Sequence, residues 1–261
     1  MTGVQTCALP ICLSSEAMRF EEQIETVLNV AERWPVDGYY VVVEHPDGRY
    51  LVDDPVWLTD LLLLCAGMKI QGREVILGYA NHQMLSAGCA GIDAMASGSW
   101  LNVRCFTTGK FSEPDADSVS RRAKWYYCPQ TLSEYKLPFL DMAFRRGSLP
   151  TLAPPSALGS EYADVLFGGA QPSTTDYSEQ QSFRHYLTCL RSQCIATVSA
   201  SFADTCSQYQ ASLNAVEAAI AAAQRAGVRG QDRDFVDVVD VNRVAVDALV
   251  NERGAVLDRV W

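Results

Sequence analysis

The sequence predicts an α/β fold, the C-terminal part of a (β/α)8 barrel with parallel strands, followed by a helical tail. Short apolar runs alternate with helical patterns between residues 15 and 97. These runs are apolar throughout, which is typical of parallel strands that are buried on both faces. The run over residues 91–99, GIDAMASGS, has the form of a closing barrel strand and its glycine-rich loop. An open doubly wound sheet is the alternative.

Each element of this alternation has a local signal. The predicted order is a helix over 15–33, a strand over 38–44, a turn over 45–49, a helix from Asp53 or Asp54 to about Ile70, a strand over 74–79, a short helix capped by Asn81 and a strand over 92–97. Residues Phe20, Ile24 and Val27 have helical spacing in the first helix. An aspartate followed by Pro55 is typical of a helix start, and the β-rich run GYYVVVE is typical of a buried strand.

The pattern changes after Trp100, where the chain becomes rich in proline. We expect a partial β/α barrel over residues 12–147 and a linker rich in Pro, Gly and Ser over 148–178. A helical C-terminal region over 179–261 follows, with one long helix or two short ones predicted over 182–210 and further helices predicted at 212–226 and 236–253.

The first residues have an unusual origin. Residues 1–11 read MTGVQTCALPI, which is the translation of a common short-read sequencing adapter. We therefore expect them to be an artefact outside the fold, and the earlier barrel strands to be missing. Three parallel strands would leave an unpaired edge, which is a template for aggregation. The sequence thus predicts a chain that is poorly soluble or oligomeric.

Composition excludes some classes of protein. The 261 residues are 48% hydrophobic and 20% charged, which is ordinary for a globular protein, and the net charge of −10 argues against a protein that coats nucleic acid. The scattered cysteines fit a reducing, cytoplasmic location. The longest apolar run, Leu61–Met68, is too short to span a membrane. We expect no membrane contact, no metal and no cofactor.

Candidate site residues follow from the rule that reactive groups of β/α barrels lie where strands end. Two are expected to be catalytic, Glu44 and His82. The expected substrate-binding residues are Tyr79, Asn81, Ser97, Gly98, Ser99, Asn102 and Arg104. A carboxylate, an imidazole, an amide, a guanidinium and a glycine-flanked turn can together hold a ligand with an anionic or polyhydroxyl part. The alternatives are structural roles: Asn81 and His82 would cap a helix, and Arg104 would form an ion pair with an acidic residue at the rim of the barrel.

Two further patterns are weaker. The segment over residues 104–127 is a candidate RNA contact, because the RRAKWYYCP run that begins in it, over residues 121–129, interleaves basic with aromatic residues. A strand docked on the barrel explains the same composition and is the preferred interpretation. His185, Cys189 and Cys194 are metal-ligand types, but their spacing is poor for zinc.

The runs GYYVVVE, VILGY and GIDAMASGSWLNVR resemble the last strands of tRNA-guanine transglycosylase barrels. The resemblance covers residues 38–104. It implies that Glu44 falls at the base-binding strand and Arg104 near an RNA-facing loop. Ala96 stands where that family has its nucleophilic aspartate, and the family's C-x-C-x-x-C zinc cluster is absent from the sequence.

These observations predict an enzyme of the transglycosylase-like barrel class that acts on a nucleoside or phosphoribosyl-type small molecule. Ala96 favours the alternative, a catalytically degenerate barrel that serves as a binding or scaffold protein. A different phosphate-binding barrel enzyme, a lyase or isomerase, is the third hypothesis.

Overall fold

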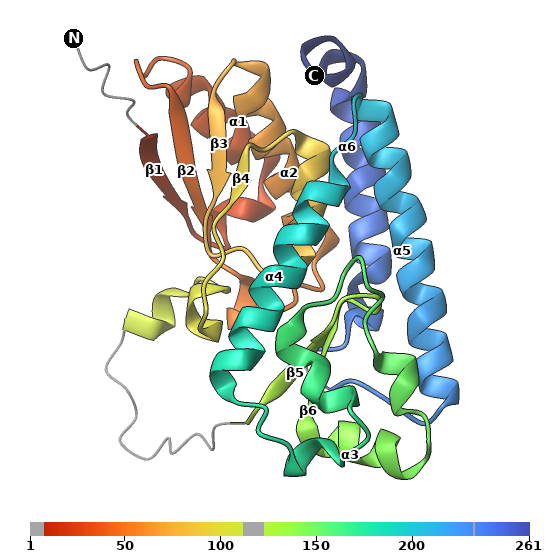
Figure 1. The fold of residues 1–261 in the computed structure, drawn as a ribbon. Helices are drawn as coiled ribbons and strands as arrows, with labels where there is room; N and C mark the ends of the chain where they lie inside the picture. Colours follow the sequence, from red (N-terminus) through yellow and green to blue (C-terminus); the bar gives the residue numbers. More distant parts are fainter. Residues whose placement is uncertain (1–7, 112–122, 232) are drawn as a thin grey trace, which may run out of the picture. The chain divides into compact units, whose positions relative to one another are not determined.

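The computed structural model describes residues 8–111, 123–231 and 233–261. The chain divides into two compact units that interleave along the sequence (Figure 1). The first unit comprises Met1–Phe111, Thr197–Tyr209 and Asp240–Trp261, and the second comprises Ser112–Ala196 and Gln210–Val239. The expected division into a barrel part, a linker and a helical region is therefore replaced by two units that share the C-terminal helices.

A four-stranded parallel sheet forms the centre of the first unit. The strands are β1 (Ala8–Leu13), β2 (Gly38–Val43), β3 (Glu74–Leu77) and β4 (Ala94–Met95), and they lie side by side in that order (Figure 1). This confirms an α/β fold with a parallel sheet. The sheet is open, and the described residues form no closed barrel.

Strand β1 corrects two expectations from the sequence. It begins at Ala8, inside the segment expected to lie outside the fold, and it pairs with β2 over all six of its residues. The physical reason is a period-two pattern: Leu9, Ile11 and Leu13 alternate with more exposed residues, and Ile11 is buried. The sheet therefore has four strands rather than three, and the edge of β2 that was expected to be unpaired is covered.

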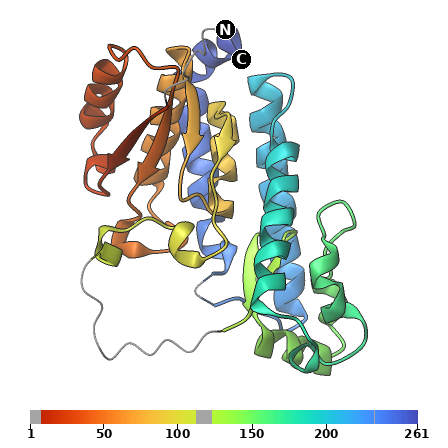
Figure 2. The same ribbon diagram turned by 60° about the vertical axis from the view of Figure 1, so that its left-hand side comes forward.

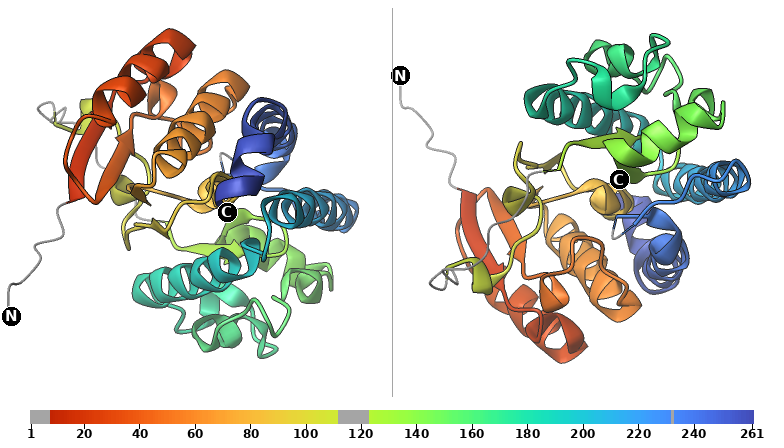
Figure 3. Two further views of the ribbon diagram at one scale, coloured as in Figure 1. Left: turned by 90° about the horizontal axis from the view of Figure 1, so that it is seen from above. Right: turned by 90° about the horizontal axis from the view of Figure 1, so that it is seen from below.

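Two helices cover one face of this sheet (Figure 3). Helix α1 (Glu21–Ala31) follows a 3-10 turn, η1 (Ala17–Arg19). Helix α2 (Pro55–Ile70) begins as predicted, because the Asp54 carboxylate accepts hydrogen bonds from the first turn. Between β2 and β3 the crossover thus contains one long α-helix, most of whose residues are buried.

The rest of the first unit is built from a buried 3-10 helix and C-terminal segments. All nine residues of η3 (His82–Ala90) are buried. Helix α6 (Val239–Val260) and the first part of α5 (Phe202–Arg225) complete this unit, and the Tyr209 hydroxyl donates to Asn242 Oδ1 over 3.0 Å. Short 3-10 turns complete the loops of this unit: η2 (Pro46–Gly48), η4 (Leu101–Val103) and η5 (Thr108–Phe111).

An antiparallel hairpin of β5 (Trp125–Cys128) and β6 (Ser133–Lys136) forms the centre of the second unit. Helix α3 (Leu137–Arg145) follows the hairpin directly, and α4 (Glu179–Thr197) also belongs to this unit except for its last residue (Figure 2). The hairpin contributes Tyr126, Cys128 and Tyr135 to the hydrophobic core of the unit. The strand interpretation of the aromatic run is thus confirmed, although the strand pairs in a hairpin rather than in the parallel sheet.

The segment over 148–178 is part of this core, and the linker expectation was wrong. It forms three 3-10 turns, η6 (Leu149–Leu152), η7 (Glu161–Phe167) and η8 (Pro172–Thr174). Leu152, Leu166 and Tyr177 within it are fully buried. The prolines start turns instead of loosening the chain, and the apolar residues between them pack on the hairpin, where the Tyr126 hydroxyl donates to Leu152 O over 2.6 Å.

Helices were predicted correctly in the C-terminal region, but their bounds were not. The chain breaks after α4 at Thr197, so the stretch over 182–210, expected to be one long helix or two short ones, belongs to two helices, and the second of them continues through 212–225. A turn begins there because the Ser199 amide donates to Thr205 Oγ1 over 2.9 Å and the Ser201 hydroxyl caps α5. One further 3-10 turn, η9 (Phe235–Val238), precedes α6.

Candidate functional site

The loop after β4 returns across the carboxyl ends of the parallel strands (Figure 2). Glu44, at the end of β2, forms a parallel bridge with Phe106, and the His45 amide donates to Phe106 O over 2.9 Å. This loop brings Phe106 and Thr108 to the strand ends that the sequence had singled out. We call Glu44, Tyr79, Phe106 and Thr108 the carboxyl-edge site.

Glu44 is held by three hydrogen bonds. The Thr108 amide and hydroxyl donate to its Oε1 over 2.9 and 2.5 Å, and the Ser15 amide donates to Oε2 over 3.3 Å. The hydrogen bonds from Thr108 lower the pKa of the Glu44 carboxyl below its ordinary value. Glu44 is therefore a carboxylate at neutral pH, suited to accept hydrogen bonds rather than to donate a proton.

Aromatic residues occupy the neighbouring strand end and the loop that is bridged to Glu44. Tyr79, at the end of β3, has a left-handed backbone (φ 54°), which is strained for a residue other than glycine. Its ring meets the Phe106 ring edge to face at 5.2 Å, and Phe106 lies 6.0 Å from the exposed ring of Phe111. Tyr79, Phe106 and Phe111 form what we call the aromatic row.

Tyr40 extends the row onto the open face of the sheet. A Cβ at Gly78 would lie 2.6 Å from two ring atoms of Tyr40, so the ring rests directly on the Gly78 backbone. Burial raises the pKa of the Tyr40 hydroxyl, and the neighbouring Tyr79 and Cys12 raise it further. Only glycine at position 78 permits this close approach.

Two expected site residues are architectural instead. His82 is fully buried and packs against the ring of Tyr50 at 5.7 Å. Asn81 is also fully buried: its Oδ1 accepts from the Gln83 amide over 2.8 Å and its Nδ2 donates to Tyr50 O over 2.6 Å. Asn81 thus caps η3 and ties it to the preceding loop. The catalytic role expected of His82 and the binding role expected of Asn81 are corrected, because neither side chain is accessible to a ligand.

The turn over residues 97–99 does not hold an anion through Arg104. The Arg104 guanidinium is buried and donates to Gly98 O over 2.7 Å and to Ser99 O over 3.2 Å. Gly98 is required because a Cβ there would lie 1.9 Å from Val103 Cγ2. Arg104 therefore stabilises the turn, and the expected anion clamp is corrected. Asn102 is exposed, and Ser97 is half-buried with no hydrogen-bond partner for its Oγ among the described residues.

Phe106 and Thr108 were missed by sequence reasoning. They lie in a loop without periodicity, 62 and 64 residues after Glu44, and no local pattern predicts that this loop returns to β2. The only sequence signal was their position shortly after the last predicted strand.

In the candidate RNA segment over 104–127, the aromatic residues of the RRAKWYYCP run that the structure describes offer little accessible surface. Tyr126 and Tyr127 are buried in the second unit, because they are strand residues of the hairpin. Trp125 is covered by the Arg233 guanidinium, 3.7 Å from its ring centre, and Arg233 in turn pairs with Glu134. Arg121 and Arg122 lie outside the described residues.

Metal-ligand residues do not gather in the described ranges, where no group of three or more His, Cys, Asp or Glu is placed to hold an ion. Nor does any helix there combine the length and apolar character needed to cross a bilayer.

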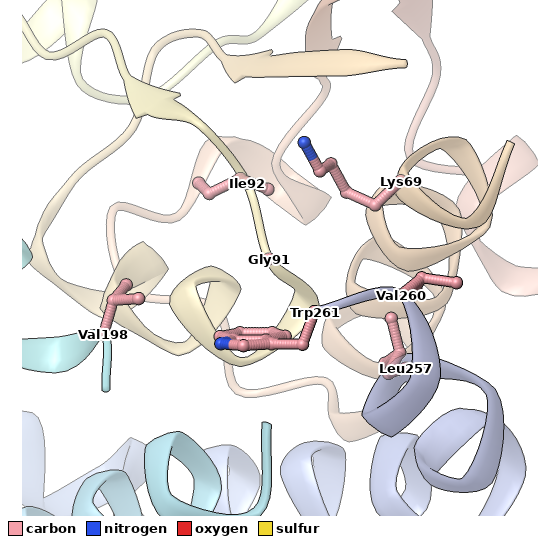
Figure 4. A pocket seen from close by; sticks show the side chains of 7 residues that line it. All are labelled: Lys69, Gly91, Ile92, Val198, Leu257, Val260 and Trp261. Atoms are coloured by element: carbon pink, nitrogen blue, oxygen red, sulfur yellow. The ribbon is translucent and has the colours of Figure 1, made fainter. Parts of the chain in front are cut away.

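A pocket of about 240 Å³ lies at the amino ends of the strands of the first unit (Figure 4). Its lining is mostly apolar, with the Trp261 indole beneath Gly91 and with Leu257 and Val260 from α6. Lys69, its charged lining residue, binds Asp93 over 2.7 Å, and Asp93 also accepts from the Val75 amide. Asp93 therefore stabilises the entrance end of the sheet, and this pocket has no reactive side chain.

Comparison with known proteins identified no relative: no family model, curated protein or solved structure matches the chain.

Proposed function

We propose that the carboxyl-edge site binds the base of a nucleoside-type small molecule. The observation that carries this proposal is an ionised, half-exposed carboxylate, Glu44, whose backbone is bridged to Phe106 of the aromatic row. Planar bases stack on aromatic side chains, and their N–H groups donate to carboxylates. The resemblance of residues 38–104 to transglycosylase barrels supports the same ligand class.

The strand order supports a barrel-type architecture for this proposal. Strands β1 to β4 follow one another without reversal, as consecutive barrel strands do, whereas a doubly wound sheet reverses its order at the switch point. Ligands of both architectures bind at the carboxyl ends of the strands. The proposed enzyme is a glycosyl- or ribosyltransferase in which Glu44 recognises the base.

A binding protein without catalysis is the second candidate, and a specific observation favours it. Ala96 lies at the end of β4, where its amide donates to Leu77 O, and offers no nucleophile. His82, the other predicted catalytic group, is buried among structural contacts. Glu44 alone does not complete a transfer mechanism, since the nucleophile must come from another residue.

The test is isothermal titration calorimetry, in which guanosine or free guanine is titrated into the full chain. Glu44→Gln and Phe106→Leu are each expected to weaken binding by about 10-fold, because each removes one hydrogen-bonding or stacking contact. Glu25→Gln, an exposed carboxylate on α1, is the matched control and should bind as the wild type does. Binding that is absent, or equal in all four proteins, would refute the proposal. Release of guanine from guanosine would distinguish the enzyme from the binding protein.

A further inference from the structure

A hydroxyl and an imidazole meet in the second unit, to which no residue of the carboxyl-edge site belongs. Ser160 Oγ lies 2.7 Å from His185 Nδ1. Ser160 precedes η7, and its side chain makes no capping hydrogen bond to that turn. His185 lies on α4, 25 residues further along the chain. The hydroxyl is therefore directed at the imidazole rather than at the local backbone.

The direction of the proton in this pair follows from the other ring nitrogen. His185 Nε2 lies 2.7 Å from Tyr127 O, and a carbonyl oxygen can only accept a hydrogen bond. Nε2 therefore carries the ring proton, and Nδ1 presents its lone pair to Ser160. The hydroxyl donates to Nδ1, which is the arrangement of a nucleophile and its general base, with the tautomer held by a third group.

The surroundings keep this base neutral. His185 is fully buried, and its ring stacks on Tyr126 with centroids 5.1 Å apart and planes 16° apart. Burial lowers the pKa of His185, while the hydrogen bond to Tyr127 O and the charge of Asp164 oppose that shift. The imidazole is free to accept a proton at neutral pH, and Asp164 and the Tyr127 carbonyl stabilise the imidazolium that forms.

Ser160 is accessible from a pocket of about 400 Å³. Ala153, Pro154 and Phe167 line its apolar part, and Glu161 and Asp164 supply two negative charges. An anionic substrate is repelled by these carboxylates. The pocket is of a size for a small acyl group that is uncharged or cationic.

We propose that Ser160 is a nucleophile with His185 as its general base, and that the second unit transfers acyl groups from small uncharged esters to water. Ser160 Oγ forms a bond to the ester carbonyl carbon while its proton passes to His185 Nδ1. The carbon–alkoxide bond then breaks, and the departing alcohol takes that proton. The oxygen of a water molecule then forms a bond to the acyl carbon and gives a proton to Nδ1. The bond between that carbon and Ser160 Oγ breaks, the carboxylic acid leaves, and the proton passes from Nδ1 to Ser160 Oγ.

The full chain tests this proposal with a fluorophosphonate probe and with p-nitrophenyl acetate. We expect covalent labelling at Ser160, located by peptide mass spectrometry, and a labelling rate that falls at least about 100-fold in Ser160→Ala. Ser156→Ala removes another pocket hydroxyl and should label as the wild type does. Labelling that is absent, or unchanged in Ser160→Ala, would overturn the proposal.

A second measurement separates activation by His185 from mere exposure of the hydroxyl. The wild-type labelling rate should rise with pH and level off below the pH expected for free imidazole, since burial lowers the pKa of His185. The groups that face His185 are Asp164 on η7, Cys189 on α4 and Tyr126 and Tyr127 on β5.

Activation by His185 can also be tested without substituting that buried residue, whose removal could destabilise the unit. The nucleophile itself is replaced by cysteine instead. Ser160→Cys should react with iodoacetamide about 10-fold faster at pH 7 than Ser156→Cys, because an adjacent imidazole favours the thiolate. Equal reactivity of the two variants would show that His185 does not activate this position.

Discussion

The carboxyl edge of the parallel sheet and the Ser160–His185 pair use buried polar groups in opposite ways. At the carboxyl edge, Asn81 and Arg104 bind backbone groups of neighbouring loops, and their hydrogen bonds hold the loops in place. In the second unit, the buried His185 binds one carbonyl and presents its other nitrogen to a hydroxyl that faces a pocket. The position of a residue at a strand end is therefore a weaker indication of a reactive group than a hydrogen bond that leaves a nitrogen lone pair facing a nucleophile.

Among the variants that test this comparison, Arg104→Ala is expected to have the largest effect on stability. The variant leaves Gly98 O and Ser99 O without the donor that now serves them, and it should lower the free energy of unfolding by about 3 kcal/mol. Urea unfolding followed by circular dichroism measures this, with the exposed Arg33→Ala as control. A variant as stable as the wild type would return Arg104 to the candidate ligand-binding residues.

A smaller loss is expected for Asn81→Ala, about 2 kcal/mol, because both the cap of η3 and the bond to Tyr50 O disappear. Asn81→Asp keeps the capping oxygen but not the donor, and should lie between the wild type and Asn81→Ala. Amide hydrogen exchange of η3 in the two variants locates the effect. Unchanged exchange in Asn81→Ala would contradict an architectural role.

The buried carboxyl of Asp60, in the first unit, is expected to lower the stability of the protein when it is ionised. Burial, together with the negative charges of Glu21, Glu252 and Asp54, raises the pKa of its carboxyl to about 6. In the unfolded chain the Asp60 carboxyl ionises near pH 4, whereas in the folded protein it ionises near pH 6. The free energy of unfolding should therefore fall as the pH rises from 4 to above 6 and then level off. Asp60→Asn should remove this dependence and stabilise the protein by about 1–2 kcal/mol at pH 8, measured by thermal melts across pH. A variant that melts in parallel with the wild type at every pH would rule this out.

The smallest effect on stability is expected at Glu44. Its lowered pKa contributes stability that is present above the unfolded pKa and lost as the pH falls through the folded value. Glu44→Gln should therefore cost about 0.5 kcal/mol at pH 7, because the site is solvated, and nothing once the carboxyl is protonated. A loss of several kcal/mol would place Glu44 with Arg104 as architecture and weaken its role in ligand binding. The midpoints of urea unfolding of the wild type and of Glu44→Gln, measured at pH 7 and at acid pH, give this difference in stability.

Local signals predicted the elements that local physics determines. Asp54 and Pro55 begin α2 as expected, and the apolar runs at β2 and β3 form parallel strands. Strand β1 was missed because its residues were assigned to an adapter, although Leu9 and Ile11 alternate as strand residues do. The segment over 148–178 was misread because proline and glycine content was weighed above its buried leucines.

Of the predicted site residues, Glu44 and Tyr79 lie together at the carboxyl edge, whereas His82, Asn81 and Arg104 are buried among structural contacts. Sequence position placed all of them near strand ends, but it did not show which side chains reach a ligand. Accessibility depends on the loop that carries Phe106 back to β2, and no local pattern encodes that return.

The sequence by itself determined the α/β class, the strands β2 and β3 and the start of helix α2, because side-chain periodicity and capping act over a few residues. The tertiary structure alone decided the pairing of Ser160 with His185, the loop partners of Glu44 and the burial of Arg104. Those contacts join residues far apart in the chain, so their energies depend on how the elements pack rather than on local propensity.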